Sequence, residues 1–314
     1  MRTVSAIKNI NSTLIVYGLN MVLQFIIRFV LLYYLSIEYL GLNGLFDNIL
    51  TVLSLTELGI GPAIIFSLYS PLANHDLETA KSIMRIFKKA YIYIGTLILF
   101  LGLCISPFVQ YLIKVPPNIA YLNIFFLLFV VDTGISYFYS YKKCLLIADQ
   151  KQYIANYYRG ITQLIGSLFQ IALVILTHSF WVYIILRICM TFSENFLIAR
   201  KADHLYSFLN EKNIQPLNKD IYQSIIRNIK ALILHKIGGV TVFGTSNIIL
   251  SKFVGLSAVA LYTNYYLIIN GIDKLSDQVF NALKASVGNL NESHDDAHKL
   301  VIFKRLEFMT AYLA

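Results

Sequence analysis

The feature that most constrains this chain is a series of apolar runs, each long enough to cross a lipid bilayer as a helix. A membrane helix needs about 20 residues to cross roughly 30 Å of hydrocarbon. The runs are too long for the strands of a membrane barrel, so each is predicted to be helical. By this measure, membrane spans are expected near residues 10–36, 42–70, 88–113, 118–141, 157–177, 180–200, 231–251 and 257–284, and a ninth begins near residue 302.

The composition agrees with a membrane protein. Hydrophobic residues make up 57% of the 314 residues and charged residues 14%, whereas soluble domains carry about 25% charged residues. This excludes a soluble enzyme, a disordered tail and a disulfide-rich secreted domain. The three cysteines lie within or at the ends of apolar runs and have no disulfide or metal-ligand spacing, so they are interpreted as small hydrophobic side chains.

The positions of Lys and Arg predict the orientation. If the N-terminus is cytoplasmic, most of the 26 Lys and Arg residues fall in cytoplasmic segments, and the outer loops hold only Lys114 and Lys252. This asymmetry follows the positive-inside rule and predicts a multi-pass protein with a cytoplasmic N-terminus. Because topology accounts for the net charge of +9, no nucleic-acid partner is expected.

Three domains are predicted. Residues 1–204 would form an N-lobe of six transmembrane helices, residues 205–230 a cytoplasmic amphipathic linker, and residues 231–314 the start of a C-lobe with helices seven, eight and part of nine. Residues 86–89 (IFKK) and 302–305 (IFKR) correspond, as do 40–43 and 259–262, at nearly equal offsets. Such correspondences indicate that helices seven to nine repeat helices one to three. The C-lobe would then be incomplete, and the chain is expected to be part of a longer protein.

Polar side chains recur at helical spacing within the predicted spans, which places them on one face of each helix. Buried polar and ionisable residues are costly in a membrane and by default mark a site or a pathway. We therefore predict a solvated cavity inside the bundle. The candidate substrate-binding residues are Asn20, Gln24, Arg28, Arg187 and Lys274, and the candidate ion-coupling or cavity carboxylates are Asp47, Asp132, Glu194 and Asp277.

Other interpretations of these stripes remain open. The same side chains could form interhelical hydrogen bonds and ion pairs that hold the bundle together. Carboxylates outnumber cations within the predicted spans. They could bind H⁺ or Na⁺ and couple that ion to transport, or they could pair with cations on helices that follow residue 314. No metal site and no organic cofactor are expected.

Gly59, Gly61 and Pro62 interrupt the second span. Proline removes a backbone hydrogen bond and kinks a helix, so these residues are predicted to form a hinge for alternating access. The alternative is a fixed bend that serves packing.

Two parts of the sequence resemble a known family. Residues 57–64 (ELGIGPAI) and 67–73 (SLYSPLA) resemble the second helix and the following loop of bacterial polysaccharide repeat-unit flippases of the Wzx type. Residues 244–250 (GTSNIIL) and 259–266 (VALYTNYY) resemble their seventh and eighth helices. These flippases belong to the multidrug/oligosaccharidyl-lipid/polysaccharide exporter superfamily.

The resemblance implies an all-α integral membrane fold in which two lobes of helices form a V around a central cavity. It implies a transporter rather than an enzyme, situated in the bacterial plasma membrane. The implied substrate is an undecaprenyl-pyrophosphate-linked oligosaccharide, moved from the inner to the outer leaflet for capsule, exopolysaccharide or O-antigen assembly. Arg28 and Arg187 match the basic cavity residues that would hold the pyrophosphate. Membrane lipids and other polysaccharide-assembly proteins are the implied partners.

Two alternatives to the flippase are kept. The acidic residues favour a cation-coupled multidrug antiporter of the same superfamily. A membrane-embedded polysaccharide polymerase or acyltransferase belongs to a different class, and it would need a sizeable outer loop that carries catalytic residues. The predicted outer loops are only a few residues long.

Overall fold

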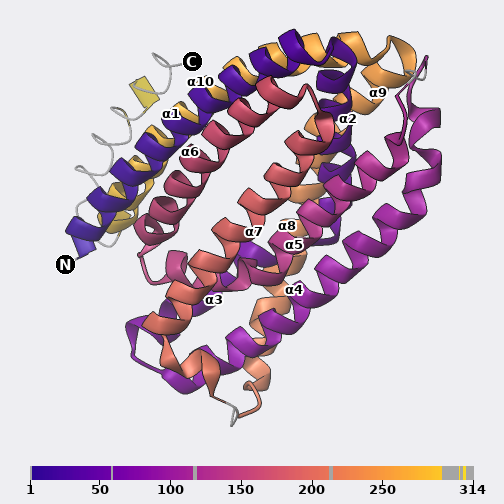
Figure 1. Cartoon of the computed structure of the whole chain (residues 1–314). Helices are drawn as coiled ribbons and strands as arrows, with labels where there is room; N and C mark the ends of the chain where they lie inside the picture. Colours follow the sequence, from indigo (N-terminus) through magenta and orange to yellow (C-terminus); the bar gives the residue numbers. More distant parts are fainter. Residues whose placement is uncertain are drawn as a thin grey trace. The chain divides into compact units, whose positions relative to one another are not determined.

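A computed structural model describes residues 2–57, 59–115, 119–211 and 215–291, together with 304, 307 and 308. Within this part of the chain all regular elements are helical and no strand occurs (Figure 1). The prediction of an all-helical chain is therefore confirmed. The α-helices are α1 (Arg2–Tyr34), α2 (Ile37–Leu53), α3 (Ile60–Ala73), α4 (Leu77–Ile105), α5 (Leu122–Ala148), α6 (Gln152–Thr177), α7 (Phe180–Leu205), α8 (Lys219–Phe243), α9 (Ser246–Phe253) and α10 (Leu256–Asn291), and the 3₁₀ helices are η1 (Ser54–Glu57), η2 (Ser106–Leu112) and η3 (Ser207–Asn210).

The helices are long and apolar enough for a multi-pass membrane protein. Among the described residues, six segments qualify as membrane spans, and a seventh qualifies if the bent pair Ile37–Glu57 and Ile60–Ala73 crosses as one. The six are Asn11–Tyr34, Leu77–Leu112, Leu122–Ala148, Gln152–Thr177, Phe180–Leu205 and Lys219–Phe253. They coincide with the expected spans one and three to seven, and the bent pair coincides with the second.

The structure differs from the sequence prediction after α7. The described residues of the expected linker, 205–230, include η3 and the first turns of α8 rather than one amphipathic helix. Since α8 continues from Lys219 to Phe243, the expected linker and the seventh span share one helix. The region expected as an eighth span, 257–284, lies in α10, which is not among the segments that qualify. Asparagines and tyrosines in its first turns lower its hydropathy. The ninth span, expected from residue 302, falls almost wholly outside the described residues.

The chain divides into two compact units. The first unit ends at Asn264, so it contains α1 to α9 and the first turns of α10. The second unit begins at Tyr265, and its described part includes the rest of α10, which ends at Asn291. Helices α8 and α9 pack against α2 and α3 within the first unit, and the lobe boundary expected near residue 204 stays a prediction.

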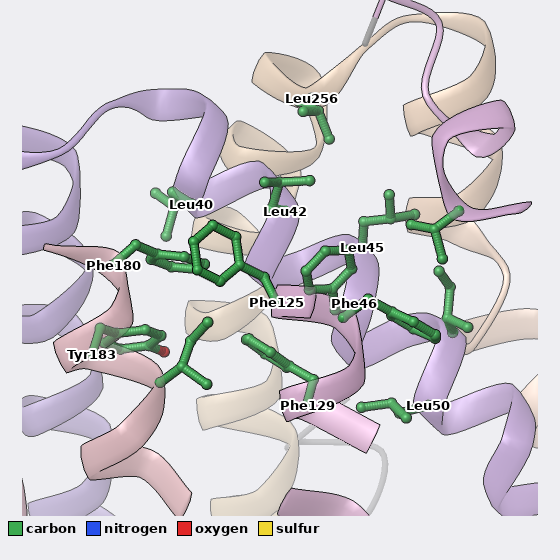
Figure 2. Close-up of a cluster of buried hydrophobic side chains, with 14 of the residues drawn as sticks. Leu40, Leu42, Leu45, Phe46, Leu50, Phe125, Phe129, Phe180, Tyr183 and Leu256 are labelled. Atoms are coloured by element: carbon green, nitrogen blue, oxygen red, sulfur yellow. The ribbon is translucent and has the colours of Figure 1, made fainter. Parts of the chain in front are cut away.

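Two hydrophobic clusters hold the first unit together at opposite ends of α5 and α7. One joins the start of these helices to α1 and α2, and it includes Phe46, Phe125, Phe129 and Phe180 (Figure 2). The other joins the ends of α5 and α7 to the starts of α3 and α4. Helices α1 and α6 pack along each other, as do α6 and α7, α5 and α7, and α4 and α5 (Figure 1). The middle turns of α5 and α7 lie between the two clusters, and the charged side chains occur there.

Gly41 on α2 allows a close helix contact that positions the start of α10. A Cβ atom at this residue would overlap the backbone carbonyl group of Leu256. Leu256 is buried in the same cluster as Phe46 (Figure 2). Since a backbone carbonyl cannot move aside as a flexible side chain can, only glycine fits at residue 41.

Asp76 defines the start of α4. Its carboxylate accepts a hydrogen bond of 3.0 Å from the amide of Thr79, which satisfies one of the amides left free at a helix start. Hydrogen bonding from the side chain and the amide of Thr79 lowers the pKa of Asp76. The carboxylate is therefore ionised at neutral pH, and its charge favours the helix N-terminus.

Candidate functional site: a polar cavity in the helix bundle

A polar cavity of 290 Å³ lies among α1, α2, α5, α6 and α7 of the first unit. Five of the residues predicted from the sequence on α1, α2 and α5 line it, as does Arg187 on α7. Most of the other lining residues are also polar, although the helices around them are apolar. The lining residues are Asn20, Leu23, Gln24, Ile27, Arg28, Leu31, Asn43, Asp47, Asp132, Gln163, Ser167, Gln170, Tyr183, Arg187, Met190 and Thr191.

Arg187 is the central residue of a charge cluster at this cavity. Its Nη2 donates to Oδ1 of Asp47 at 2.8 Å, and its Nε donates to Oδ2 of Asp132 at 2.9 Å. Its Nη1 donates to Oδ1 of Asn43 at 3.1 Å. The guanidinium carbon lies 4.4 Å from the ring centre of Phe129, a cation–π distance. Arg187 is thus held by side chains from α2 and α5, and its charge is shared between two carboxylates.

Neighbouring polar groups fix the cluster in place. The Tyr183 hydroxyl donates to the same Asn43 oxygen at 3.2 Å. The Tyr183 carbonyl accepts a hydrogen bond of 2.7 Å from Nε2 of Gln170 on α6. The Tyr183 ring stacks on Phe180 within the first hydrophobic cluster (Figure 2). The charge cluster is therefore anchored to the packed end of the bundle.

Arg28, on α1, differs from Arg187 in its hydrogen-bond partners. Its Nη1 donates to Oδ1 of Asn264 at 3.1 Å, which is a bond to a neutral partner. Within the described residues, no carboxylate lies within 4.0 Å of its guanidinium group. The two arginines expected to share one role therefore differ: Arg187 forms ion pairs with two carboxylates, whereas Arg28 forms no ion pair with a described carboxylate and interacts with Asp47 only at longer range.

One carboxylate oxygen of the cluster has no donor. The Asp132 side chain is only 7% exposed, and its Oδ2 is engaged by Arg187. Its Oδ1 is buried and has no hydrogen-bond partner among the described residues. An unsatisfied oxygen of this kind is costly unless a proton, a cation or a water molecule satisfies it.

The sequence predicted an excess of carboxylates, but the described lining is balanced. It contains two arginines and two aspartates. Glu194 lies apart from the lining and contacts α6, where it accepts a hydrogen bond of 3.3 Å from Gln163 and lies 4.0 Å from Arg159. The side chains of Lys274 and Asp277 lie outside the described residues.

The break in the second span lies at Gly59 rather than at Pro62. Gly59 has a φ of +76° and precedes α3, and the two helical segments meet at 44°. Pro62 lies in the first turn of α3, where its missing amide costs no hydrogen bond. The left-handed conformation of Gly59, one of the three predicted hinge residues, therefore accounts for the bend, and the hinge for alternating access stays a prediction. A Cβ atom at Gly59 would lie 2.8 Å from Cβ of Leu232 on α8. Gly61 follows the bend, where a Cβ atom would lie 3.0 Å from both Oε1 of Glu57 and the hydroxyl of Tyr91.

The sequence interpretation missed the contribution of α6. Gln163, Ser167 and Gln170 line the cavity and follow one another at intervals of four and three. This is the same helical spacing that indicated the other stripes. The spacing could therefore have been found. The contributions of Tyr183 and Met190 follow only from packing.

No group of three or more His, Cys, Asp or Glu side chains suited to a metal ion occurs among the described residues. Comparisons with the models of known protein families, with curated protein sequences and with solved structures found no match.

Proposed function

We propose that the chain forms part of a flippase for lipid-linked oligosaccharides, as the resemblance of residues 57–73 and 244–266 implies. The observation that supports this proposal most is that Arg28 lines the cavity without forming an ion pair with any described carboxylate. A guanidinium group forms paired, charge-assisted hydrogen bonds to phosphate oxygens. Arg28 would therefore bind the pyrophosphate that links the lipid to the sugar.

The rest of the lining fits this ligand. Asn20 and Gln24 precede Arg28 on the same face of α1 and line the same cavity. Amide groups donate and accept hydrogen bonds, as the hydroxyls of a sugar require. The volume of 290 Å³ equals that of about ten water molecules. It can hold a diphosphate with part of the first sugar, and the remaining sugars would extend outside it.

The proposed flippase would work in a bacterial plasma membrane, with its N-terminus in the cytoplasm. The charge asymmetry of the loops supports this orientation. The cluster around Arg187 would keep α2, α5 and α7 in register while the substrate is bound near α1. In this proposal, Arg187 has the role of a positioning residue and Arg28 that of a binding residue.

Complementation tests the proposal. In cells that lack the gene, the full-length protein with Arg28→Ala should fail to restore surface polysaccharide at normal expression. Arg28→Lys should restore it partly, because a lysine keeps the charge but loses the paired geometry. Full export by the Arg28→Ala protein would remove Arg28 from substrate binding.

A cation-coupled multidrug antiporter remains a second candidate. The observation that favours it is the unpartnered Oδ1 of Asp132, which could accept a proton or a sodium ion. Efflux of a cationic dye by cells that express the full-length protein distinguishes the two candidates. An antiporter extrudes the dye, whereas an oligosaccharide flippase does not.

A further inference from the structure

A second cavity, of 340 Å³, lies near the start of α4 and has a basic lining. Helix α4 contributes most of it, Tyr141 of α5 contributes one side, and the segment that follows α7 contributes the rest. It does not share any residue with the cavity that contains Arg28. The lining residues are Lys81, Met84, Arg85, Lys88, Lys89, Ile92, Tyr141, Phe208, Leu209 and Glu211.

Four cations line this second cavity against a single carboxylate. They come from α4 at spacings of four, three and one residues, which places them along one face of the helix. Lys81 is only 6% exposed and is already engaged by Glu78 at 2.6 Å and Glu211 at 2.5 Å. Lys88 and Lys89 are exposed, and no carboxylate of the described residues lies within 4.0 Å of either amine. Their charge is therefore available to an anion.

One wall of this cavity is apolar. It consists of Phe208 and Leu209 of η3, and Met84 and Ile92 lie among the cations on α4. Phe208 is buried in the second hydrophobic cluster, and Leu209 packs against it, so the wall is fixed. A hydrogen bond of 2.7 Å from the Ser82 hydroxyl to the carbonyl of Gln215 holds the same segment against α4. A free inorganic anion needs cations only, whereas an amphipathic anion uses both walls.

The length of α4 places this cavity at the level of lipid headgroups. The segment Leu77–Leu112 has 36 residues. As a helix it would extend for roughly 50 Å, whereas the hydrocarbon core measures ~30 Å. No charged residue occurs between Ala90 and Leu112, and this part of the segment is long enough to cross the hydrocarbon, so the basic turns up to Lys89 lie outside it. Basic pockets at the ends of membrane helices recognise the phosphates of anionic lipids.

We propose that this cavity binds the phosphate headgroup of an anionic phospholipid. Lys88 and Lys89 would contact the phosphate, and the upper part of the lipid would lie against Ile92 and Leu209. This site is independent of the proposed transport substrate, so its failure would leave the role of Arg28 untouched.

A fluorescence experiment on the reconstituted chain tests this site. The chain contains a single tryptophan, so a Trp181→Phe and Ile92→Trp protein has its one tryptophan at the edge of the cavity. Brominated phosphatidylglycerol and brominated phosphatidylcholine quench tryptophan only when they are in contact with it. Because each lysine near a membrane surface adds roughly fivefold to anionic-lipid binding, we expect phosphatidylglycerol to bind at least about fivefold more tightly than phosphatidylcholine.

Two variants with equal charge changes provide the comparison. Lys88→Gln with Lys89→Gln should reduce the preference to about one. Arg200→Gln with Lys201→Gln removes the same charge from the end of α7, outside the cavity, and should leave the preference unchanged. Both pairs should elute as folded protein, because neither pair forms an ion pair that the described residues contain.

Three outcomes would overturn the proposal. Equal quenching by the two lipids would show that the cavity does not select anionic lipid. Retention of the preference after loss of Lys88 and Lys89 would assign it to another surface. If inorganic phosphate or pyrophosphate in millimolar excess abolished quenching by phosphatidylglycerol, the ligand would be a free phosphate rather than a lipid.

Discussion

Replacing Arg187 by glutamine removes the cation that lies between Asp47 and Asp132. The two carboxylates would then face each other across the cavity without a counter-charge. Both hydrogen bonds to carboxylates, at 2.8 and 2.9 Å, would be lost or weakened. The loss of one partner from a buried ion pair destabilises a protein by about 3–5 kcal/mol.

The exposure of the partners decides where in this range the cost falls. Asp47 is 42% exposed, so solvent screens much of its interaction. Asp132 is 7% exposed and carries most of the penalty. We therefore expect Arg187→Gln to lower the free energy of unfolding by about 3 kcal/mol, at the lower end of the range.

A double-mutant cycle tests this assignment. Adding Asp132→Asn to Arg187→Gln should recover more than half of the lost stability, because the buried uncompensated charge is removed. Adding Asp47→Asn should recover less. The measurement is reversible unfolding of the protein in detergent, followed by circular dichroism. Unchanged stability of Arg187→Gln, or an equal recovery from both second mutations, would refute the reasoning.

Three further predictions concern the same unit of the structure. Gly41→Ala should lower the free energy of unfolding by about 1–3 kcal/mol, because the added methyl group overlaps the Leu256 carbonyl. The control is Gly18→Ala, which has nothing within 4 Å of its Cβ position and should not lower it in the same unfolding assay. Asn156→Ala should lower the free energy of unfolding by about 1–2 kcal/mol, because the Asn156 amide donates at 3.0 and 2.9 Å to two hydroxyls of α1. Hydrogen exchange should then be faster in the first half of α1. If the cavity carboxylates couple transport to an ion gradient, Asp47→Asn should blunt the response of export to dissipating that gradient; an unchanged response would argue against coupling there.

The helices and the cavity stripes could be predicted from the sequence for a simple physical reason. A membrane leaves a polar side chain few stable positions, so helical spacing alone shows which residues face inward. Asn20, Gln24, Arg28, Asp47, Asp132 and Arg187 were selected in this way, and all line one cavity. The spacing does not show which charges pair. It therefore treated Arg28 and Arg187 alike, although only Arg187 is held by carboxylates.

Features that depend on backbone conformation could not be predicted from spacing. The sequence pattern predicted a kink because of Pro62. Pro62 lies in the first turn of α3, however, and the bend depends on the positive φ of Gly59. The charged residues in 219–230 suggested a surface linker, whereas α8 carries them directly into a membrane-spanning segment. A helix can extend beyond the hydrocarbon without any change in its hydrogen bonding, so charge alone does not mark its end.

The central claim is that the intact protein moves an oligosaccharide linked to a lipid by pyrophosphate across the membrane, with Arg28 holding the pyrophosphate. The most direct measurement determines which leaflet holds lipid-linked oligosaccharide in cells that lack the gene, with the leaflet assigned by an enzyme that cleaves only the exposed sugar. The account predicts accumulation on the cytoplasmic face and loss of surface polysaccharide, both reversed by the unaltered gene and not by Arg28→Ala. Normal amounts on both faces, with normal surface polysaccharide, would contradict it.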